Sequence, residues 1–223
     1  MELEEKVIEF AADTQKLLDQ VLPGIRTVKA ESREQRFIVR ADPDWLPLTV
    51  KGQHLADLRI SFYCGADSTG VYLAVAESYF VLKSKLAKAP LVRLDYLRDM
   101  RTAPACHWQV HAERGAFSHL LANAQTKAPH DLSSLHFPVG GARHRPCLED
   151  FLQFLFCECG IDPKEGWKNS IKAGREKWRR LQTSALVRDA PMEAARVLEK
   201  LGYTVQPPKN GHKEANLAAL QRW

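Results

Sequence analysis

The stretch LRISFYCGADSTGVYLAV, residues 58–75, decides the fold class of this chain. In each half of it, every second residue is apolar: Leu58, Ile60, Phe62, Val71, Leu73 and Val75. Alternation with a period of two is the pattern of a β-strand that buries one face. Residues 67–70, between the halves, have the composition of a turn, so the two halves are predicted to pair as an antiparallel hairpin.

The same periodicity continues on both sides of this hairpin. Six strands are predicted, at residues 25–30, 36–41, 57–64, 70–82, 91–97 and 107–113. Their short connections leave no room for crossover helices, so we expect an antiparallel meander of about five to six strands rather than a repeated βαβ unit.

Helices are predicted before and after the meander. Residues 3–22 place their apolar side chains on one stripe. Three further helices are expected: one that begins at Pro146 and ends at Gly160, one from Pro163 with a buried stripe that includes Trp178 and Leu181, and one from Asp189 to Gly202. A short helix at 115–125 and an edge strand at 203–205 are weaker expectations. The fold class is therefore predicted to be α+β.

The domain organisation and the compartment follow from length and composition. Residues 1–206 are predicted to form a single α+β domain, with a helical subdomain at 161–206, and residues 207–223 a polar tail. The five cysteines are irregularly spaced and make a poor disulfide framework, which predicts a reducing cytoplasm. No apolar run has the length of a membrane span, and the acidic, amphipathic N-terminus is unlike a signal peptide.

The net charge of +5 is concentrated in one predicted helix. Residues 164–188 contain eight cations and two anions. Five of these cations recur at three- and four-residue steps and so share one stripe: Lys164, Lys168, Lys172, Arg175 and Arg179. Such a stripe can follow a nucleic-acid backbone, dock an acidic protein or simply be solvated.

A polar sheet face is the first candidate for chemistry. If the last two predicted strands pair, one face carries Arg93, Asp95, His107, Gln109, His111 and Glu113. Imidazole and carboxylate groups bind divalent metals, and histidine exchanges protons near neutral pH. We therefore expect His107, His111, Asp95 and Glu113 to be catalytic, with His107 and His111 as ligands if a divalent metal is the cofactor. The alternative is an ordinary solvated sheet face.

A cationic loop is the second candidate. Gly140-Gly141 is followed by Arg143 and Arg145 just before a predicted helix. Amide groups at a helix N-terminus together with two arginines favour a phosphate site, and a plain connecting loop is the alternative.

A cysteine just inside the same helix is the third candidate. Cys147 at a helix N-terminus would have a lowered pKa and act as a nucleophile, or it would be a small buried residue that seats the helix. The segment around His136-Phe137-Pro138 and Cys147 is similar to that of ubiquitin-conjugating enzymes, in which Cys147 would be the thioester nucleophile. The His-Pro-Asn motif of that family is absent here, because Phe137 intervenes.

The segment LHFPVGGARHRPCLEDFL, residues 135–152, resembles a group of uncharacterised bacterial, largely actinobacterial, hypothetical proteins. The likeness extends from the meander to REKWR at 175–179 and LGY at 201–203. The group brings no catalytic residue, and the resemblance implies a toxin or defence role.

Three functions remain open from the sequence. The first is an enzyme or toxin-like factor that acts on nucleic acid or a nucleotide through the polar sheet face. The second is a non-catalytic module that binds nucleic acid or an acidic protein through the basic helix. The third is a cysteine-dependent transfer protein.

Overall fold

A computed structural model describes residues 3–33, 36–67, 70–112, 128, 130–131, 137–139 and 143–221 of the chain. The short helix predicted at 115–125 lies outside these residues.

Helices precede and follow one sheet in the chain. The helices are α1 (Leu3–Val21), α3 (Leu148–Cys157), α4 (Trp167–Asp189), α5 (Pro191–Lys200) and α6 (Leu217–Leu220). The strands are β1 (Thr27–Arg33), β2 (Arg36–Asp42), β3 (Leu46–Val50), β4 (Gln53–Ala66), β5 (Leu73–Ser84), β6 (Pro90–Leu97), β7 (Cys106–Val110) and β8 (Phe137–Pro138). The α+β prediction is confirmed: an N-terminal helix, an antiparallel sheet and C-terminal helices follow in that order.

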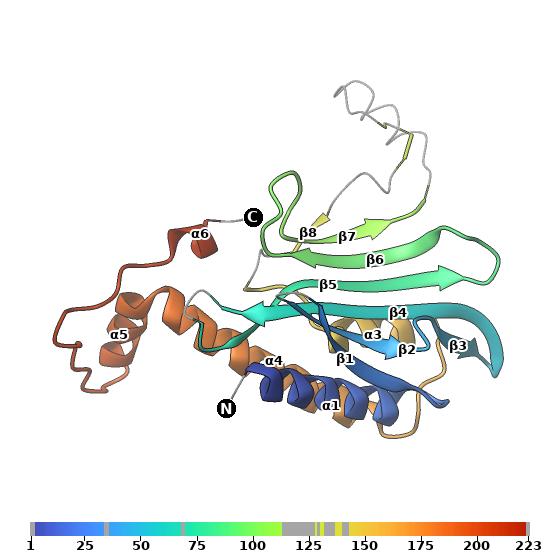
Figure 1. Cartoon of the computed structure of the whole chain (residues 1–223), viewed down its shortest axis with the longest axis horizontal. Coiled ribbons are helices and arrows are strands. Elements are labelled where there is room, and N and C mark those ends of the chain that lie inside the picture. The colour runs from blue at the N-terminus through green and yellow to red at the C-terminus, as the bar shows by residue number, and fades with distance from the viewer. Residues whose placement is uncertain are drawn as a thin grey trace.

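All eight strands pair antiparallel, in the order β1-β2-β4-β5-β6-β7-β8, and β3 pairs with β4. Figure 1 shows α1, α3 and α4 together on one face of this sheet, whereas α5 and α6 extend beyond it at one end. The predicted hairpin is present, since Ala66 pairs with Leu73 across the turn. The helices therefore cover the apolar face that the alternation predicted.

Three strand predictions need correction. β3 was not expected, because its five residues stand between a Pro-containing turn and the longest strand and include Pro47. β7 ends at Val110 rather than at residue 113. Residues 203–205 form no strand, and Tyr203 lies exposed with no neighbouring strand described beside it.

Each predicted C-terminal helix begins later than expected. Cys147 caps α3, so the helix starts after Pro146 and not at it. Gly166, at a φ of 75°, precedes α4. The carboxylate of Asp162, which directly precedes the predicted start at Pro163, accepts the backbone N–H groups of Lys51 and Gly52 at 2.9 and 2.8 Å. Asp162 therefore caps a turn between two strands through tertiary contacts, instead of capping the helix that follows it in the sequence.

Asp189 ends α4 instead of opening the next helix, α5, which begins at Pro191. The side chain of Asp189 is buried and holds an arginine from far away in the chain, as described below. In the described residues α5 and α6 contact α4, and the predicted division into subdomains stays a prediction.

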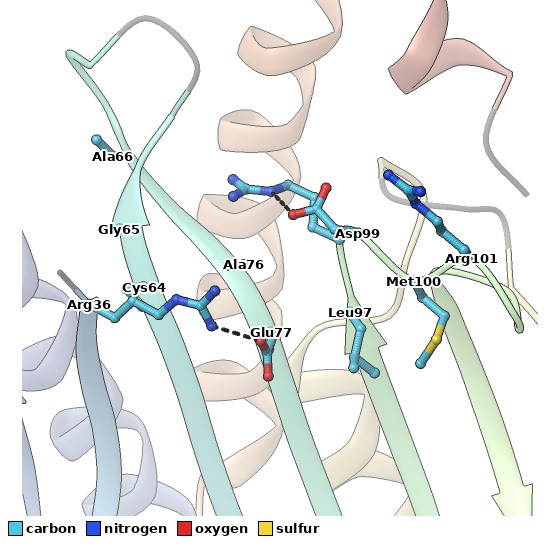
Figure 2. Close-up of a pocket in the computed structure, with 11 residues that line it drawn as sticks. Arg36, Cys64, Gly65, Ala66, Ala76, Glu77, Leu97, Asp99, Met100 and Arg101 are labelled. Atoms are coloured by element: carbon cyan, nitrogen blue, oxygen red, sulfur yellow. Dashed lines mark hydrogen bonds and ion pairs between the residues drawn. The ribbon is translucent and has the colours of Figure 1, made fainter. Parts of the chain in front are cut away.

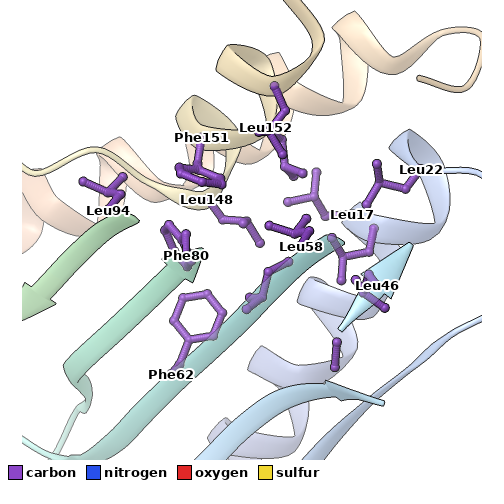
Figure 3. Packing of buried hydrophobic residues seen from close by; sticks show 14 of the residues in the cluster. Leu17, Leu22, Leu46, Leu58, Phe62, Phe80, Leu94, Leu148, Phe151 and Leu152 are labelled. Atoms are coloured by element: carbon purple, nitrogen blue, oxygen red, sulfur yellow. The ribbon is translucent and has the colours of Figure 1, made fainter. Parts of the chain in front are cut away.

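The core lies between the sheet and the three helices (Figure 3). Phe151 of α3 is fully buried, and its ring stacks on Trp108 with the ring centroids 5.6 Å apart. It also meets Phe80 of β5 at 5.8 Å. Aromatic pairs of this kind add to the free energy gained from apolar burial. Helix α3 is therefore the part of the helical layer that is fastened to the middle of the sheet.

Replacing a buried leucine of α3 tests this packing. Leu152 is 0% exposed, and Leu152→Ala is expected to lower the free energy of unfolding by about 2–5 kcal/mol, because the lost contacts leave a cavity. Chemical denaturation measures the change. The matched control is Leu86→Ala at a leucine that is 97% exposed, where a change of less than about 0.5 kcal/mol is expected. Equal effects of the two substitutions would contradict the packing described.

Candidate functional site

The polar sheet face assembles as the sequence predicted, but its central groups are buried. The register pairs Arg93 with Gln109 and Asp95 with His107. Arg93 donates to the carboxylate of Asp95 at 2.6 Å, and the ring Nδ1 of His107 donates to the carbonyl of Pro104 at 2.8 Å. His107 is 1% exposed and Asp95 3% exposed. A substrate in solvent therefore does not reach either group in this conformation.

Burial also sets the charge state of the central histidine. It lowers the pKa of His107, and Arg93 lowers it further, while the hydrogen bond to Pro104 opposes the shift. The imidazole is thus held neutral near pH 7, next to an arginine–aspartate pair. This is the arrangement of a structural hydrogen-bond network, so the predicted catalytic role of His107 and Asp95 stays a prediction.

The other two residues predicted on this face lie past the end of β7. The Nε2 atom of His111 is buried and has no hydrogen-bond partner within the described residues. Glu113 lies outside the described residues. Among the residues described, no three histidine, cysteine, aspartate or glutamate side chains are grouped to hold a metal ion. The two histidines predicted as metal ligands therefore stay a prediction.

The two arginines of the predicted phosphate loop point into the protein. Arg143 binds Asp189 at the end of α4, with Nε 2.6 Å from the carboxylate. Arg145 is 8% exposed, and its Cζ lies 3.7 Å from the ring centroid of Tyr96 and 4.7 Å from that of Trp178. Cation–π contacts of this kind are strongest where water is excluded. Arg145 thus links β6 of the sheet to α4.

Arg145 forms one wall of a cleft between the sheet and the helices. This helix–sheet cleft has a volume of about 250 Å³. Its apolar lining comes from α1 and the sheet: Phe10, Leu17, Phe62, Val75 and Phe80. Helix α4 contributes the small residues Ser170, Ala173 and Gly174, followed by Trp178 and Leu181. Leu181 was predicted to be buried in the core, but it is largely exposed at this cleft.

A buried carboxyl group from the start of α3 also lines the cleft. Glu149 is seated against α4 at Gly174, where a β-carbon would come within 2.2 Å of its Oε1. Only glycine leaves space for this contact. Burial raises the pKa of Glu149, and a hydrogen bond with the Cys147 side chain partly offsets the shift. The group is thus biased toward its neutral, protonated form.

Cys147 is held as a thiol rather than as a thiolate. It is buried, and burial together with Glu149 and Asp150 raises its pKa. Its Sγ lies 3.2 Å from a carboxylate oxygen of Asp150. A nucleophilic cysteine needs a lowered pKa and access to its substrate. The geometry therefore favours the small buried residue that seats α3, the alternative raised from the sequence.

Arg175, predicted to belong to the basic stripe, is turned toward α3. Its Nε lies 2.7 Å from Asp150, and its Nη2 donates to Gln153 at 2.5 Å. Burial alone would raise the pKa of Asp150, but the backbone N–H and side chain of Cys147 together with Arg175 lower it overall. Arg175 therefore ties α4 to α3 and is not available to a partner.

Lys164, predicted to begin the stripe, precedes α4, and its Nζ donates to the carbonyl of Asp19 at 2.7 Å. The other three cations of the stripe face solvent. Lys168, Lys172 and Arg179 are exposed on α4, and none of them forms an ion pair with any described residue. Elsewhere on this helix the cations are engaged within the protein: Lys177 with Asp13 and Arg180 with Glu176. The exposed stripe thus contains fewer cations than the sequence suggested, but no described carboxylate neutralises those that remain.

A second hollow lies at the ends of β4, β5 and β6 (Figure 2). This strand-end pocket has a volume of about 470 Å³ and contains three arginines. Arg36 is paired with Glu77 at 3.1 Å, and Arg98 with Asp99 at 3.5 Å. Because acids within the pocket offset most of its positive charge, it attracts anions less than the arginine count alone would suggest.

No model of a known protein family matches the chain, and no curated protein or solved structure is significantly similar to it. Across the described residues, every helix is too short or too polar to cross a membrane. All five cysteines are free. The function must therefore be inferred from the site itself.

The cleft was not predicted from the sequence. Trp178 was assigned to the buried stripe of its helix, and no role in a site was predicted for Tyr96 or Glu149. The small residues at 170, 173 and 174 on one face of α4 were the available signal, because they mark a close approach or a gap.

The raised pKa of Glu149 makes a pH-dependent prediction. The unfolded chain releases this proton at an ordinary pKa, about 4.3, and the folded protein at a higher one. Glu149 therefore makes its whole contribution to the free energy of unfolding at a pH below its pKa in the unfolded chain. That contribution is lost as the pH rises through its pKa in the folded protein. Glu149→Gln should raise the melting temperature at pH 8 relative to the wild type, and the gain should shrink toward pH 4.5.

Thermal unfolding followed by circular dichroism across this pH range measures the difference. Glu199→Gln, at an exposed carboxylate of α5, is the control for the removal of one carboxylate from the protein. A gain from Glu149→Gln that is the same at both pH values would show that Glu149 is not responsible.

Proposed function

We propose that this protein binds nucleic acid, without catalysis, through the exposed basic stripe formed by Lys168, Lys172 and Arg179. The observation that carries the proposal is that these three side chains are exposed and unpaired within the described residues, on one side of a helix whose remaining cations are largely engaged. Their positions fall within about 40° of arc on a helical wheel.

The dimensions of the stripe suit a phosphate backbone. From residue 168 to residue 179 the helix rises about 16 Å. Duplex DNA carries one charge per about 1.7 Å of its axis, so a stripe of this length meets several phosphates. Contacts of lysine and arginine with phosphates alone provide affinity without sequence specificity. The proposed binding is therefore electrostatic and indifferent to sequence.

The geometry favours binding over the catalytic alternative. His107 and Asp95, on which that alternative depends most, are buried and bonded within the protein. An acidic protein remains the competing partner for the stripe, because carboxylates and phosphates are both anions. Salt dependence and the choice of polyanion distinguish the two.

Binding to a fluorescent 20-base-pair DNA duplex, followed by anisotropy over a range of salt concentrations, tests the proposal. Three phosphate contacts predict a slope of about −3 in a plot of log K against log salt. Lys168→Ala/Lys172→Ala should weaken binding and reduce the steepness of the slope by about 2 units. The matched control is Lys85→Ala/Lys88→Ala, which removes two exposed lysines from the β5–β6 turn and should leave the slope unchanged.

Three outcomes contradict the proposal. Equal losses in the stripe variant and the control would mean that net charge, not α4, attracts the duplex. Tighter binding of poly-glutamate than of DNA at equal salt would identify an acidic protein as the partner. Loss of full-length duplex in the presence of Mg²⁺ or Mn²⁺ would restore the catalytic alternative.

A further inference from the structure

Helix α5 extends beyond the sheet (Figure 1), and its second half leaves an apolar side exposed. The helix contacts α4, and Ala195 in its first half is buried. From residue 196 to residue 203 every residue is exposed. Val197, Leu198 and Leu201 are 48%, 40% and 69% exposed, and their spacing places them together on one stripe. A contiguous apolar surface of this kind is typical of an interaction site, whereas a single exposed leucine is not.

Both ends of α5 are well defined, so the apolar stripe has its shape before any partner binds. Pro191 occupies the first position of the helix, where its ring holds φ at a helical value. Gly202, at a φ of 90°, ends the helix, and the N–H of Tyr203 donates to the carbonyl of Leu198 at 3.0 Å. This turn is a common glycine stop of α-helices. It holds the backbone of Tyr203, another exposed residue, against the last turn of α5.

The charges beside the apolar stripe are complementary to a second copy of the same helix. Glu193, in the first turn, and Lys200, in the last, are seven residues apart and so lie on the same flank of the stripe. When two copies of α5 pack antiparallel about a twofold axis, these flanks meet, and Glu193 of each copy faces Lys200 of the other. A twofold interface repeats every contact, so the pair forms twice.

The two side chains are available for this contact. Glu193 binds Arg196 through one carboxylate oxygen, at 2.8 Å, and both of these side chains are largely exposed. Its other oxygen can therefore accept from a partner. Lys200 is exposed and forms no ion pair with any residue that the structure describes.

A membrane surface fits α5 less well than a second copy does. A helix that lies on an anionic membrane carries an excess of lysine and arginine on its polar side. The polar side of α5 carries two acids, Glu193 and Glu199, and two bases, Arg196 and Lys200, so its charges cancel. A partner with the same balanced pattern matches this surface, and a second copy of the helix has that pattern.

We propose that two copies of this chain associate through α5, as an antiparallel twofold pair of helices with Val197, Leu198 and Leu201 at its centre. The helix has 10 residues, and two helices of this length bury less than the roughly 1,200–2,000 Å² of a standard stable interface. The dissociation constant of the dimer is therefore expected in the micromolar range. The inference does not rest on nucleic-acid binding, because the basic stripe of α4 is no part of this surface.

Sedimentation velocity of the full chain from about 1 to 500 μM measures the association. The wild type should pass from monomer to dimer within this range. Val197→Ser/Leu201→Ser removes the apolar centre of the pair and should raise the dissociation constant at least about tenfold. The matched control is Ile25→Ser/Leu86→Ser, at two apolar residues that are 100% and 97% exposed, and it should leave the dissociation constant unchanged.

An exchange of charges tests the antiparallel arrangement. Glu193→Lys and Lys200→Glu each place like charges opposite one another at two positions, so each should weaken self-association about tenfold. The double variant Glu193→Lys/Lys200→Glu restores opposite charges and should dimerise like the wild type. An equimolar mixture of the two single variants should form a heterodimer more readily than either variant forms a homodimer. Circular dichroism establishes that each variant is folded.

Four results would overturn the proposal. A wild type that stays monomeric at every concentration would exclude the dimer. Association of Val197→Ser/Leu201→Ser equal to that of the wild type would place the interface elsewhere. Single charge variants that associate like the wild type, with no preference in their mixture, would exclude the antiparallel arrangement. A monomeric wild type that binds vesicles of anionic lipid through α5 would assign the apolar stripe to a membrane.

Discussion

The packing of Phe151 against the sheet is the contact on which the rest of the structure depends. This one ring touches Trp108 of β7 and Phe80 of β5, and so it fastens α3 across three neighbouring strands. Apolar burial and aromatic packing supply the driving force, and the short helix supplies the geometry. The proposed surface for nucleic acid lies on α4, and α4 is held against α3.

Two ion pairs fix the position of α4 relative to α3 and to the segment before it. Asp150, one residue before Phe151, holds Arg175, and Arg143, on the segment before α3, holds Asp189 at the far end of the same helix. Helix α4 is thereby fixed near its middle and at its C-terminal end. Because both pairs are partly buried, they are screened by salt less than surface pairs. The helix therefore presents one side to the cleft and another to solvent in a defined orientation.

The division of side chains around α4 explains how one helix can line the cleft and also present cations to solvent. Toward the sheet it carries small residues and Trp178, and these leave a gap beside Arg145. Toward solvent it carries Lys168, Lys172 and Arg179, whose exposure is compatible with a polyanion. An α-helix of this length can serve both, because residues three or four apart share a side while residues two apart do not.

The sequence by itself determined the fold class, the hairpin at residues 58–75 and the buried side of α1 and α3. Hydrophobic periodicity reports which side of an element is buried, and that information is local. Tertiary structure alone decided that Arg145 and Glu149 are buried, that Arg175 turns inward and that Asp162 caps a strand turn instead of a helix. Those outcomes depend on partners far away in the chain, and the free energy of a charged group depends on the partner that it finds and on the water that it loses.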